Sequence, residues 1–405
     1  MKPVIFILAD AFRYDYIEKH SLKYIESIIK ESETEVSEKL YPSTGYCEII
    51  EYFTGQESHE HGMFSQITAV DNWKEKKTPI LFDFLEPFDH FFSGIRKVRF
   101  VWNKITQKIL PLFVDKNTAN IKYRVPLSIL NRFVPTESLF EYDSYEFGGE
   151  KNVFVNMKSN NISYDLDDFV KHNKISGLDC DRFSRLNEKI DNNQLSDFTM
   201  IYISAPEYAH FHGVDGVETR NKLQEFDISV GELQHKLKAK YNNDYDLFIV
   251  GDHGMLDVLD SINIQEVINN ISKKYSYKLG TDYLYFIDST VCRLWYSSDE
   301  IKCTFEEFIL EELGGNLELS SDVICYLEQF KPKYGDSIFL VKANKVYFPD
   351  FFNGIPNKGM HGYLNHYEGQ QGCVIWNGTH SRKLPPKIKL SEVKDLIWSA
   401  VNERD

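Results

Sequence analysis

The 405-residue sequence lacks an apolar run long enough to cross a membrane. No apolar run approaches the roughly 18 residues that a membrane-spanning helix needs. The N-terminal stretch MKPVIFILAD is apolar for only a few residues and has no small-residue cleavage site. It predicts a first core strand and not a signal peptide, so we expect no transmembrane segment.

Cysteine is scarce, and its spacing carries no metal or redox motif. The six cysteines form no C-x-x-C pair, which argues against a zinc knuckle and against a thioredoxin-like site. They are Cys47, Cys180, Cys292, Cys303, Cys325 and Cys373. Because most have apolar neighbours, the sequence predicts buried, reduced thiols and a cytoplasmic protein.

Positive charge is also in short supply, with 46 Lys and Arg against 61 Asp and Glu and a net charge of −15. Binding to a nucleic-acid duplex needs clustered Lys and Arg, so this balance argues against it. A small phosphate-bearing substrate is still compatible, because a metal ion can supply the positive charge locally. Nothing in the sequence indicates the oligomeric state.

What the sequence does contain is a set of short apolar runs separated by helical patterns. The runs at 4–9, 198–205, 247–251 and 372–378 are typical of parallel strands buried on both faces. The segment 217–241 has apolar residues at helical spacing. The sequence therefore predicts an α/β fold with a mostly parallel central sheet sandwiched by helices.

Two long segments interrupt this pattern and predict insertions into the core. The first is a mainly helical cap over the site, apolar with interleaved basic residues at 91–114 and 123–142. The second is a smaller α+β insertion. The predicted division is 1–65 core, 66–195 cap, 196–262 core, 263–345 insertion and 346–405 core.

Candidate ligands lie at the ends of the predicted strands, where sites of open α/β sheets are found; five follow a strand, and His361 comes just before the last one. They comprise three carboxylates and three histidines, namely Asp10, Glu207, His210, Asp252, His253 and His361. Mixed sets of this kind suit Zn²⁺ or Mn²⁺, and six ligands suit two ions. Each residue alone has an ordinary structural explanation, such as a helix cap or a core histidine, but the ordered set favours a two-metal site for phosphoryl transfer.

The stretches VIFILADAFR, FTGQESHEHGM, VGDHGM and KGMHGY resemble the motifs of the alkaline phosphatase superfamily, in particular its type I phosphodiesterase / nucleotide pyrophosphatase branch. The resemblance implies an alkaline phosphatase-like core with two divalent ions, Zn²⁺ first and Mn²⁺ as an alternative. It implies that Glu207, His210 and His361 bind one ion. It implies that Asp10, Asp252 and His253 bind the other, with the nucleophile oxygen bridging toward both.

Two positions depart from the family pattern and leave alternatives open. The acid of the "PEYAH" stretch precedes His210 by three residues instead of four, and His212 is a rival to His210. The family interval to the nucleophile, counted back from Thr54, lands on Gly45. Thr44 is therefore the preferred nucleophile and metal-bridging residue, Ser43 the second choice and Cys47 the third.

The implied activity is a metal-dependent phosphodiesterase or nucleotide pyrophosphatase-like hydrolysis through a covalent phospho-enzyme on Thr44 or Ser43. The substrate is a small phosphate ester linked to a nucleotide, a lipid or a glycan. Transfer of a phospho-group onto a sugar or lipid-carrier alcohol, phosphomonoester hydrolysis and a non-catalytic scaffold are the alternatives. No C-x-P-x-R sequence supports a sulfatase.

Overall fold

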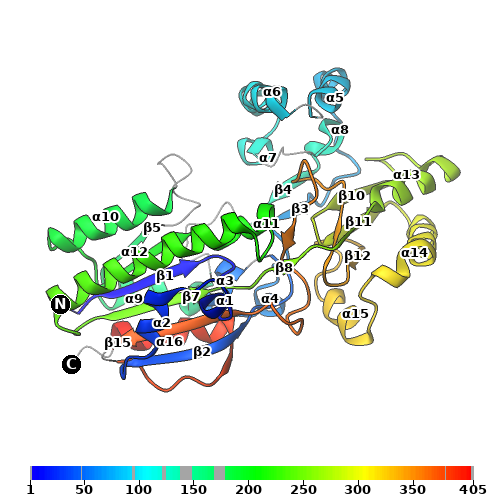
Figure 1. Cartoon of the computed structure of the whole chain (residues 1–405). Coiled ribbons are helices and arrows are strands. Elements are labelled where there is room, and N and C mark those ends of the chain that lie inside the picture. Colours follow the sequence, from blue (N-terminus) through cyan, green and yellow to red (C-terminus); the bar gives the residue numbers. More distant parts are fainter. Residues whose placement is uncertain are drawn as a thin grey trace.

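The computed structural model of the chain describes residues 2–46, 48–93, 96–120, 125–136, 148–167, 178–378 and 380–402. Its centre is a seven-stranded sheet with the order β16-β2-β15-β7-β1-β6-β5 (Figure 1). The strands are β1 (Val4–Ala9), β2 (Thr34–Tyr41), β5 (Tyr164–Asp167), β6 (Phe198–Ile203), β7 (Asp246–Gly251), β15 (Gly372–Gly378) and β16 (Lys387–Lys389). The predicted α/β fold class is confirmed.

The sheet is mixed because one strand runs against the rest. β1 lies parallel to both β6 and β7, and β5 and β16 are parallel to their neighbours. β15 is antiparallel to β7 and to β2. The expectation that 372–378 is a parallel strand is wrong, because an apolar run buried on both faces carries no information about strand direction.

Helices cover both faces of the sheet, as alternation along the central strand requires. Val4, Phe6 and Leu8 of β1 belong to one apolar cluster, while its alternate residues belong to another on the opposite face. The first face is covered by α3 (Glu48–Thr54), α9 (Val153–Ser159) and α16 (Val393–Asn402). The second is covered by α2 (Lys23–Ile29), α10 (Asp179–Asp191) and α12 (Val217–Tyr241). The central strands are thus shielded from water on both sides.

The segment predicted as a cap contains elements of the core. β5 pairs with β6 at the edge of the main sheet, and α9 and α10 pack on it. The β5 sequence YDLD has no apolar run because an edge strand keeps polar side chains, and Asp167 pairs with Arg185 of α10. Outside the sheet lie β3 (Ile67–Ala69), α5 (Ile80–Ser93), α6 (Arg96–Ile109), α7 (Lys116–Asn120), α8 (Leu127–Leu130) and β4 (Phe133–Pro135).

The second insertion contains an antiparallel three-stranded sheet, β10 (Tyr283–Ile287), β11 (Val291–Tyr296) and β12 (Ser337–Leu340). Around it lie α13 (Ile264–Tyr275), α14 (Asp299–Leu313) and α15 (Ser321–Glu328). The β3–β4 ribbon shares its apolar core, with the rings of Phe133 and Phe286 5.1 Å apart. Shorter elements are α1 (Tyr16–Lys19), α4 (Ser58–His61), α11 (Ala209–His212), β8 (Leu256–Asp257), β9 (Asp260–Ile262), β13 (Lys345–Tyr347) and β14 (Gly359–Met360).

Five of the cysteines fall within the described residues, and all five are unpaired thiols. Cys292 and Cys373 are buried as predicted, whereas Cys180, Cys303 and Cys325 are exposed, so the expectation of burial is wrong for these three. These three lie on the outward faces of α10, α14 and α15, and the face of the helix decides their exposure. In the described part of the chain, we find no helix of the length and hydropathy required to span a membrane.

A buried carboxylate fixes the start of the central strand β7. Asp246 is fully buried and accepts a hydrogen bond of 2.8 Å from the indole nitrogen of Trp376 on β15. Its other oxygen lies 3.0 Å from Nδ1 of His380. The carboxylate therefore ties β7 to β15 and to the chain beyond it.

Replacing Asp246 with alanine is expected to lower the free energy of unfolding by about 3 kcal/mol, because it leaves the Trp376 donor buried and unpaired. Chemical denaturation followed by tryptophan fluorescence measures this. Asp244→Ala is the control, since its side chain is 65% exposed and forms a long ion pair of 3.6 Å with Lys2. Equal losses in the two variants would contradict a structural role for the Asp246 network.

Candidate metal centre and active site

The candidate ligands come together at the carboxyl ends of three adjacent strands. Asp10 follows β1, Glu207 lies in the turn after β6, and Asp252 follows β7. Ligand atoms of Asp10, Asp252 and His253 all lie within 4.8 Å of one another. This is the triad that the family resemblance implies for a single ion.

Two backbone amides hold the Asp252 carboxylate in place. Its Oδ1 accepts hydrogen bonds from the amide of Ala11 at 3.1 Å and from the amide of His253 at 2.9 Å. Gly254 completes the turn, since a Cβ there would lie 2.0 Å from the carbonyl oxygen of Gly369. Close packing therefore requires the glycine of the D-H-G sequence. The two amides occupy Oδ1 of Asp252, and Oδ2 would be available for a metal.

Backbone carbonyls orient two of the histidines. Nδ1 of His253 donates to the carbonyl of Gly254, and Nδ1 of His210 donates to the carbonyl of Gly359, both at 2.9 Å. Each bond leaves Nε2 as the nitrogen able to bind a metal, and Nε2 of His253 lies 3.3 Å from Asp10. Protein histidine ligands commonly have this arrangement.

His361 completes a cluster of three imidazoles. Its ring stacks on that of His253 with centroids 3.9 Å apart, and it lies 5.3 Å from the ring of His210. Nδ1 of His361 is buried without a hydrogen-bond partner among the described residues. His212 is exposed and stacks on Tyr208 instead, so the structure brings His210 and not its rival to this cluster.

Tyr202 connects the two predicted ligand sets, although the sequence pattern did not predict a role for it. Its hydroxyl lies 2.6 Å from Oδ2 of Asp10 and 3.0 Å from Oε2 of Glu207. A tyrosine near the end of the buried run 198–205 is a visible signal, but burial of an aromatic ring is its simpler explanation. With a single hydroxyl proton, Tyr202 can satisfy only part of the hydrogen-bonding capacity of two carboxylates.

The electrostatics of the cluster favour added positive charge. Burial and the neighbouring Asp252 raise the pKa of Asp10 to about 6, and burial with Asp10 raises the pKa of Glu207 to about 8. Burial alone would lower the pKa of His253, but the Asp252 and Asp10 carboxylates raise it to about 9. Without a cation, the carboxylates therefore retain protons or share the proton of His253.

The donor set fits divalent metal ions. Crowded carboxylates, imidazoles with Nε2 oriented by backbone bonds and the unpartnered His361 nitrogen are what a buried metal centre requires. The triad Asp10, Asp252 and His253 would hold one ion. His210 and His361 would contribute to the second, with Glu207 near Asp10 through Tyr202.

Glu48 is a further candidate ligand that the sequence analysis missed. It is the first residue of α3, and its carboxylate lies within 4.8 Å of ring nitrogens of His253 and His361. An acid in the first turn of a helix is so commonly explained by the helix dipole that its position alone carries little signal. The structure gives it a place between the two predicted metal sites, since His253 and His361 belong to different ones.

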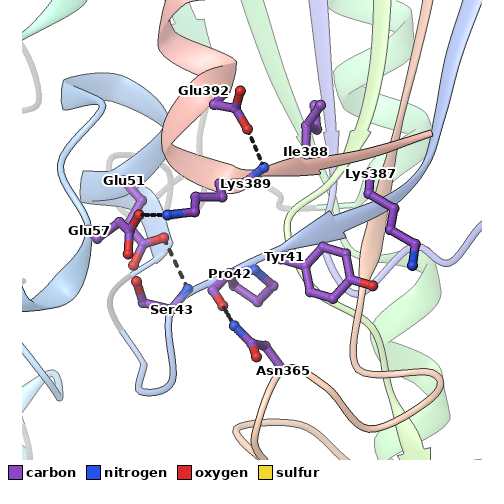
Figure 2. Close-up of a pocket in the computed structure, with 10 residues that line it drawn as sticks. All are labelled: Tyr41, Pro42, Ser43, Glu51, Glu57, Asn365, Lys387, Ile388, Lys389 and Glu392. Carbon is purple, nitrogen blue, oxygen red and sulfur yellow. Dashed lines mark hydrogen bonds and ion pairs between the residues drawn. The ribbon is translucent and has the colours of Figure 1, made fainter. Parts of the chain in front are cut away.

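The two ends of the loop that carries the candidate nucleophiles lie in different surroundings. Ser43 lines a cavity of about 330 Å³ together with Glu51, Glu57 and Lys389 (Figure 2). Its amide donates to Glu51 and its Oγ accepts from the amide of Ser58. Further along the loop, the ring of Tyr46 lies 5.6 Å from that of His361. Thr44 lies between these ends.

Thr44 itself is buried, and its carbonyl oxygen accepts a hydrogen bond of 2.7 Å from the hydroxyl of Tyr326. Gly45, where the family interval lands, has a φ of +139° and would place a Cβ 2.7 Å from the carbonyl oxygen of Phe64. A side-chain nucleophile therefore does not fit at position 45. Cys47, the third candidate, lies outside the described residues.

A cavity of about 250 Å³ opens beside the imidazole cluster. The rings of Tyr46, Phe211 and Phe352 line it, together with His210 and His361. Further lining residues are Ser65, Gln66, Asp288, Ser289, Asn353, Asn357 and Met360. Aromatic rings beside amide and hydroxyl groups suit a flat, polar organic group next to the metal ligands.

Comparison with known proteins identifies relatives by fold and by family. The model of the type I phosphodiesterase / nucleotide pyrophosphatase family matches residues 4–295. Human ectonucleotide pyrophosphatase / phosphodiesterase 5 has a TM-score of 0.67 at 14% identity, over 99% of this chain and 95% of that chain. The murine protein of that name, solved alone and as an inactive variant in complex with AMP, has a TM-score of 0.66 at 15% identity over the same shares. No curated protein sequence matches.

Glu48→Gln is expected to weaken binding of Zn²⁺ or Mn²⁺ at one of the two sites by about 10- to 100-fold, because an amide oxygen is a poorer ligand than a carboxylate. Isothermal titration calorimetry of the metal-free protein measures this. Glu26→Gln, a change on the exposed surface of α2, should leave both affinities unchanged. Wild-type affinity in Glu48→Gln would exclude Glu48 as a ligand.

Metal binding is expected to release about two protons at pH 7, because His253 and Glu207 are protonated there in the metal-free protein and must lose their protons to bind. The release should decline as the pH rises toward 10, above both pKa values. Calorimetric titrations in buffers of different ionisation enthalpy count the protons. A release that is absent at pH 7 would show that these groups are not ligands.

Proposed function

We propose that this chain, which belongs to the type I phosphodiesterase / nucleotide pyrophosphatase family and is a phosphoric ester hydrolase, uses two divalent metal ions. With them it would cleave a nucleotide-like phosphodiester or pyrophosphate. The observation that carries the proposal is the cluster of Asp10, Asp252, His253 and His361 at one edge of the sheet. The metals are Zn²⁺ or Mn²⁺, since both accept mixed nitrogen and oxygen ligands. When bound, such ions neutralise the charge of the phosphate group and acidify a hydroxyl.

The residues of the chain supply the remaining parts of the mechanism. Hydrogen bonds from Nδ1 to backbone carbonyls fix the ring orientations of His210 and His253. Their Nε2 atoms are therefore held in place, and these side chains need little rearrangement before the reaction. The Tyr202 hydroxyl keeps Asp10 and Glu207 at a fixed separation. The hydroxyl oxygen of Thr44, or of Ser43 in its place, would attack phosphorus and displace the alcohol or phosphate leaving group. Water would then cleave the resulting covalent phospho-enzyme and release the hydroxyl again.

The cavity beside His361 supports a substrate with a flat organic group. Its three aromatic rings can stack on a base, and its amide groups can form hydrogen bonds to the edge of that base. The murine relative binds AMP as an inactive variant, which is consistent with a nucleotide-like ligand here. A lipid or glycan ester and a cytoplasmic location stay predictions from the sequence.

His361→Ala and Asp252→Ala are each expected to lower kcat/KM for an aryl phosphodiester by about 1,000-fold or more, because each removes a ligand at the reacting centre. Chelation of the wild-type protein should have the same effect, and Zn²⁺ or Mn²⁺ should reverse it. His212→Ala serves as the matched control, since this exposed histidine lies on the same turn as His210. Retained turnover in His361→Ala would refute the proposal.

The same assay separates the two nucleophiles. Thr44→Ala should abolish turnover and the covalent intermediate trapped by acid quench, whereas Ser43→Ala should retain both, because the Ser43 Oγ is already engaged by the Ser58 amide. The reverse pattern would assign the nucleophile to Ser43. Product analysis with added alcohols tests whether an acceptor other than water takes the phospho-group.

A further inference from the structure

The helices α5 and α6 form a hairpin that projects from the body of the protein (Figure 1). Nine of the 21 large apolar residues exposed in the described structure fall within residues 80–113, so exposed apolar surface is concentrated on this hairpin. They are Ile80, Phe84, Phe88, Phe91, Val98, Val101, Ile105, Leu112 and Phe113. A surface of this kind marks an interaction site.

The exposed residues of α5 form one continuous stripe. Ile80, Phe84, Phe88 and Phe91 follow one another at intervals of four, four and three, which places them on a single face of the helix. Phe84 is 66% exposed and Phe91 is 64% exposed. Phe82, on the opposite face, is fully buried in the apolar core below. The outer stripe is therefore additional to the face that the fold itself uses.

The hairpin is held together without that stripe. The rings of Phe92 and Trp102 lie 5.0 Å apart across the two helices, and the indole nitrogen of Trp102 donates to Asp89 at 2.6 Å. Glu86 accepts a hydrogen bond from the amide of Ser128, which anchors α5 to α8. These contacts join α5 to α6 and to α8, and they leave the outer apolar stripe exposed.

The charge of this region is opposite to that of the whole chain. Residues 90–114 contain five Lys or Arg and no Asp or Glu, in a chain with a net charge of −15. Lys104 and Lys108, one helical turn apart, are exposed beside Val101 and Ile105 of α6. Apolar residues flanked by basic ones on a projecting helix match the boundary between lipid headgroups and acyl chains.

We propose that the α5–α6 hairpin binds the surface of a bilayer that contains anionic lipid. Phe84 and Phe91 would enter the boundary between headgroups and acyl chains, and Lys104 and Lys108 would lie among the lipid phosphates. Charge complementarity favours this occupant, because residues 90–114 are basic without acids, and two of the three acids of α5, Glu86 and Asp89, accept hydrogen bonds within the fold. The proposal concerns the hairpin alone and does not depend on the metal centre.

The test is co-sedimentation of the full chain with vesicles of phosphatidylcholine alone or mixed equally with phosphatidylglycerol. We expect binding to the mixed vesicles that is at least about 10-fold stronger than binding to the neutral ones and that falls in 1 M salt. Phe84→Ser with Phe91→Ser should weaken binding to mixed vesicles by at least about 10-fold. Lys104→Glu with Lys108→Glu should remove the preference for anionic lipid.

The matched control is Leu259→Ser with Ile355→Ser, which removes two exposed apolar side chains elsewhere on the surface. Circular dichroism and turnover of a water-soluble diester should match the wild type in all three double variants, since none touches the ligand cluster. Failure of the wild type to bind mixed vesicles overturns the proposal, as does equal weakening by the control. If the wild type is a dimer and the variant Phe84→Ser with Phe91→Ser is a monomer, the hairpin binds a second copy of the chain. That result would also overturn the proposal.

Discussion

Acidic side chains at the end of a buried sheet repel one another, and the arrangement of the site follows from that repulsion. Asp10, Glu207 and Asp252 occupy the ends of adjacent strands, where burial penalises every charged form. The chain offsets part of this cost through two amides on Asp252 and through the hydroxyl of Tyr202. Bound cations would offset the remainder, and Nε2 of His253, 3.3 Å from Asp10, is placed to share such an ion with that carboxylate.

The central strand β7 transmits this arrangement to the rest of the fold. Asp246 fixes its start to β15, and the turn after its end is packed so closely that only glycine fits at position 254. The backbone of this turn also provides the acceptor for His253 and one donor for Asp252. A small shift of β7 would therefore move Asp252 and His253 together, which links the stability of the sheet to the geometry of the site.

The sequence was sufficient to predict the α/β fold and the residues that meet at the edge of the sheet, because buried apolar runs predict strands and strand ends converge. It was insufficient where a signal had a simpler explanation. Tyr202 resembles a core aromatic, and Glu48 resembles an acid at a helix N-terminus. β5 escaped prediction because an edge strand keeps polar residues, and the direction of β15 is set by tertiary pairing that the local sequence does not encode.

The loop before α3 shows how this chain departs from a fixed family pattern. Gly45 is required by its positive φ and by the carbonyl of Phe64, so an attacking side chain cannot be supplied from that position. The same loop ends at Glu48, whose carboxylate reaches the histidines of both predicted metal sites. An added carboxylate there lowers the net charge of a two-metal centre and makes it less attractive to an anionic phosphate. In the proposed mechanism, this loop would therefore influence both the binding of the phosphate and the position of the nucleophile.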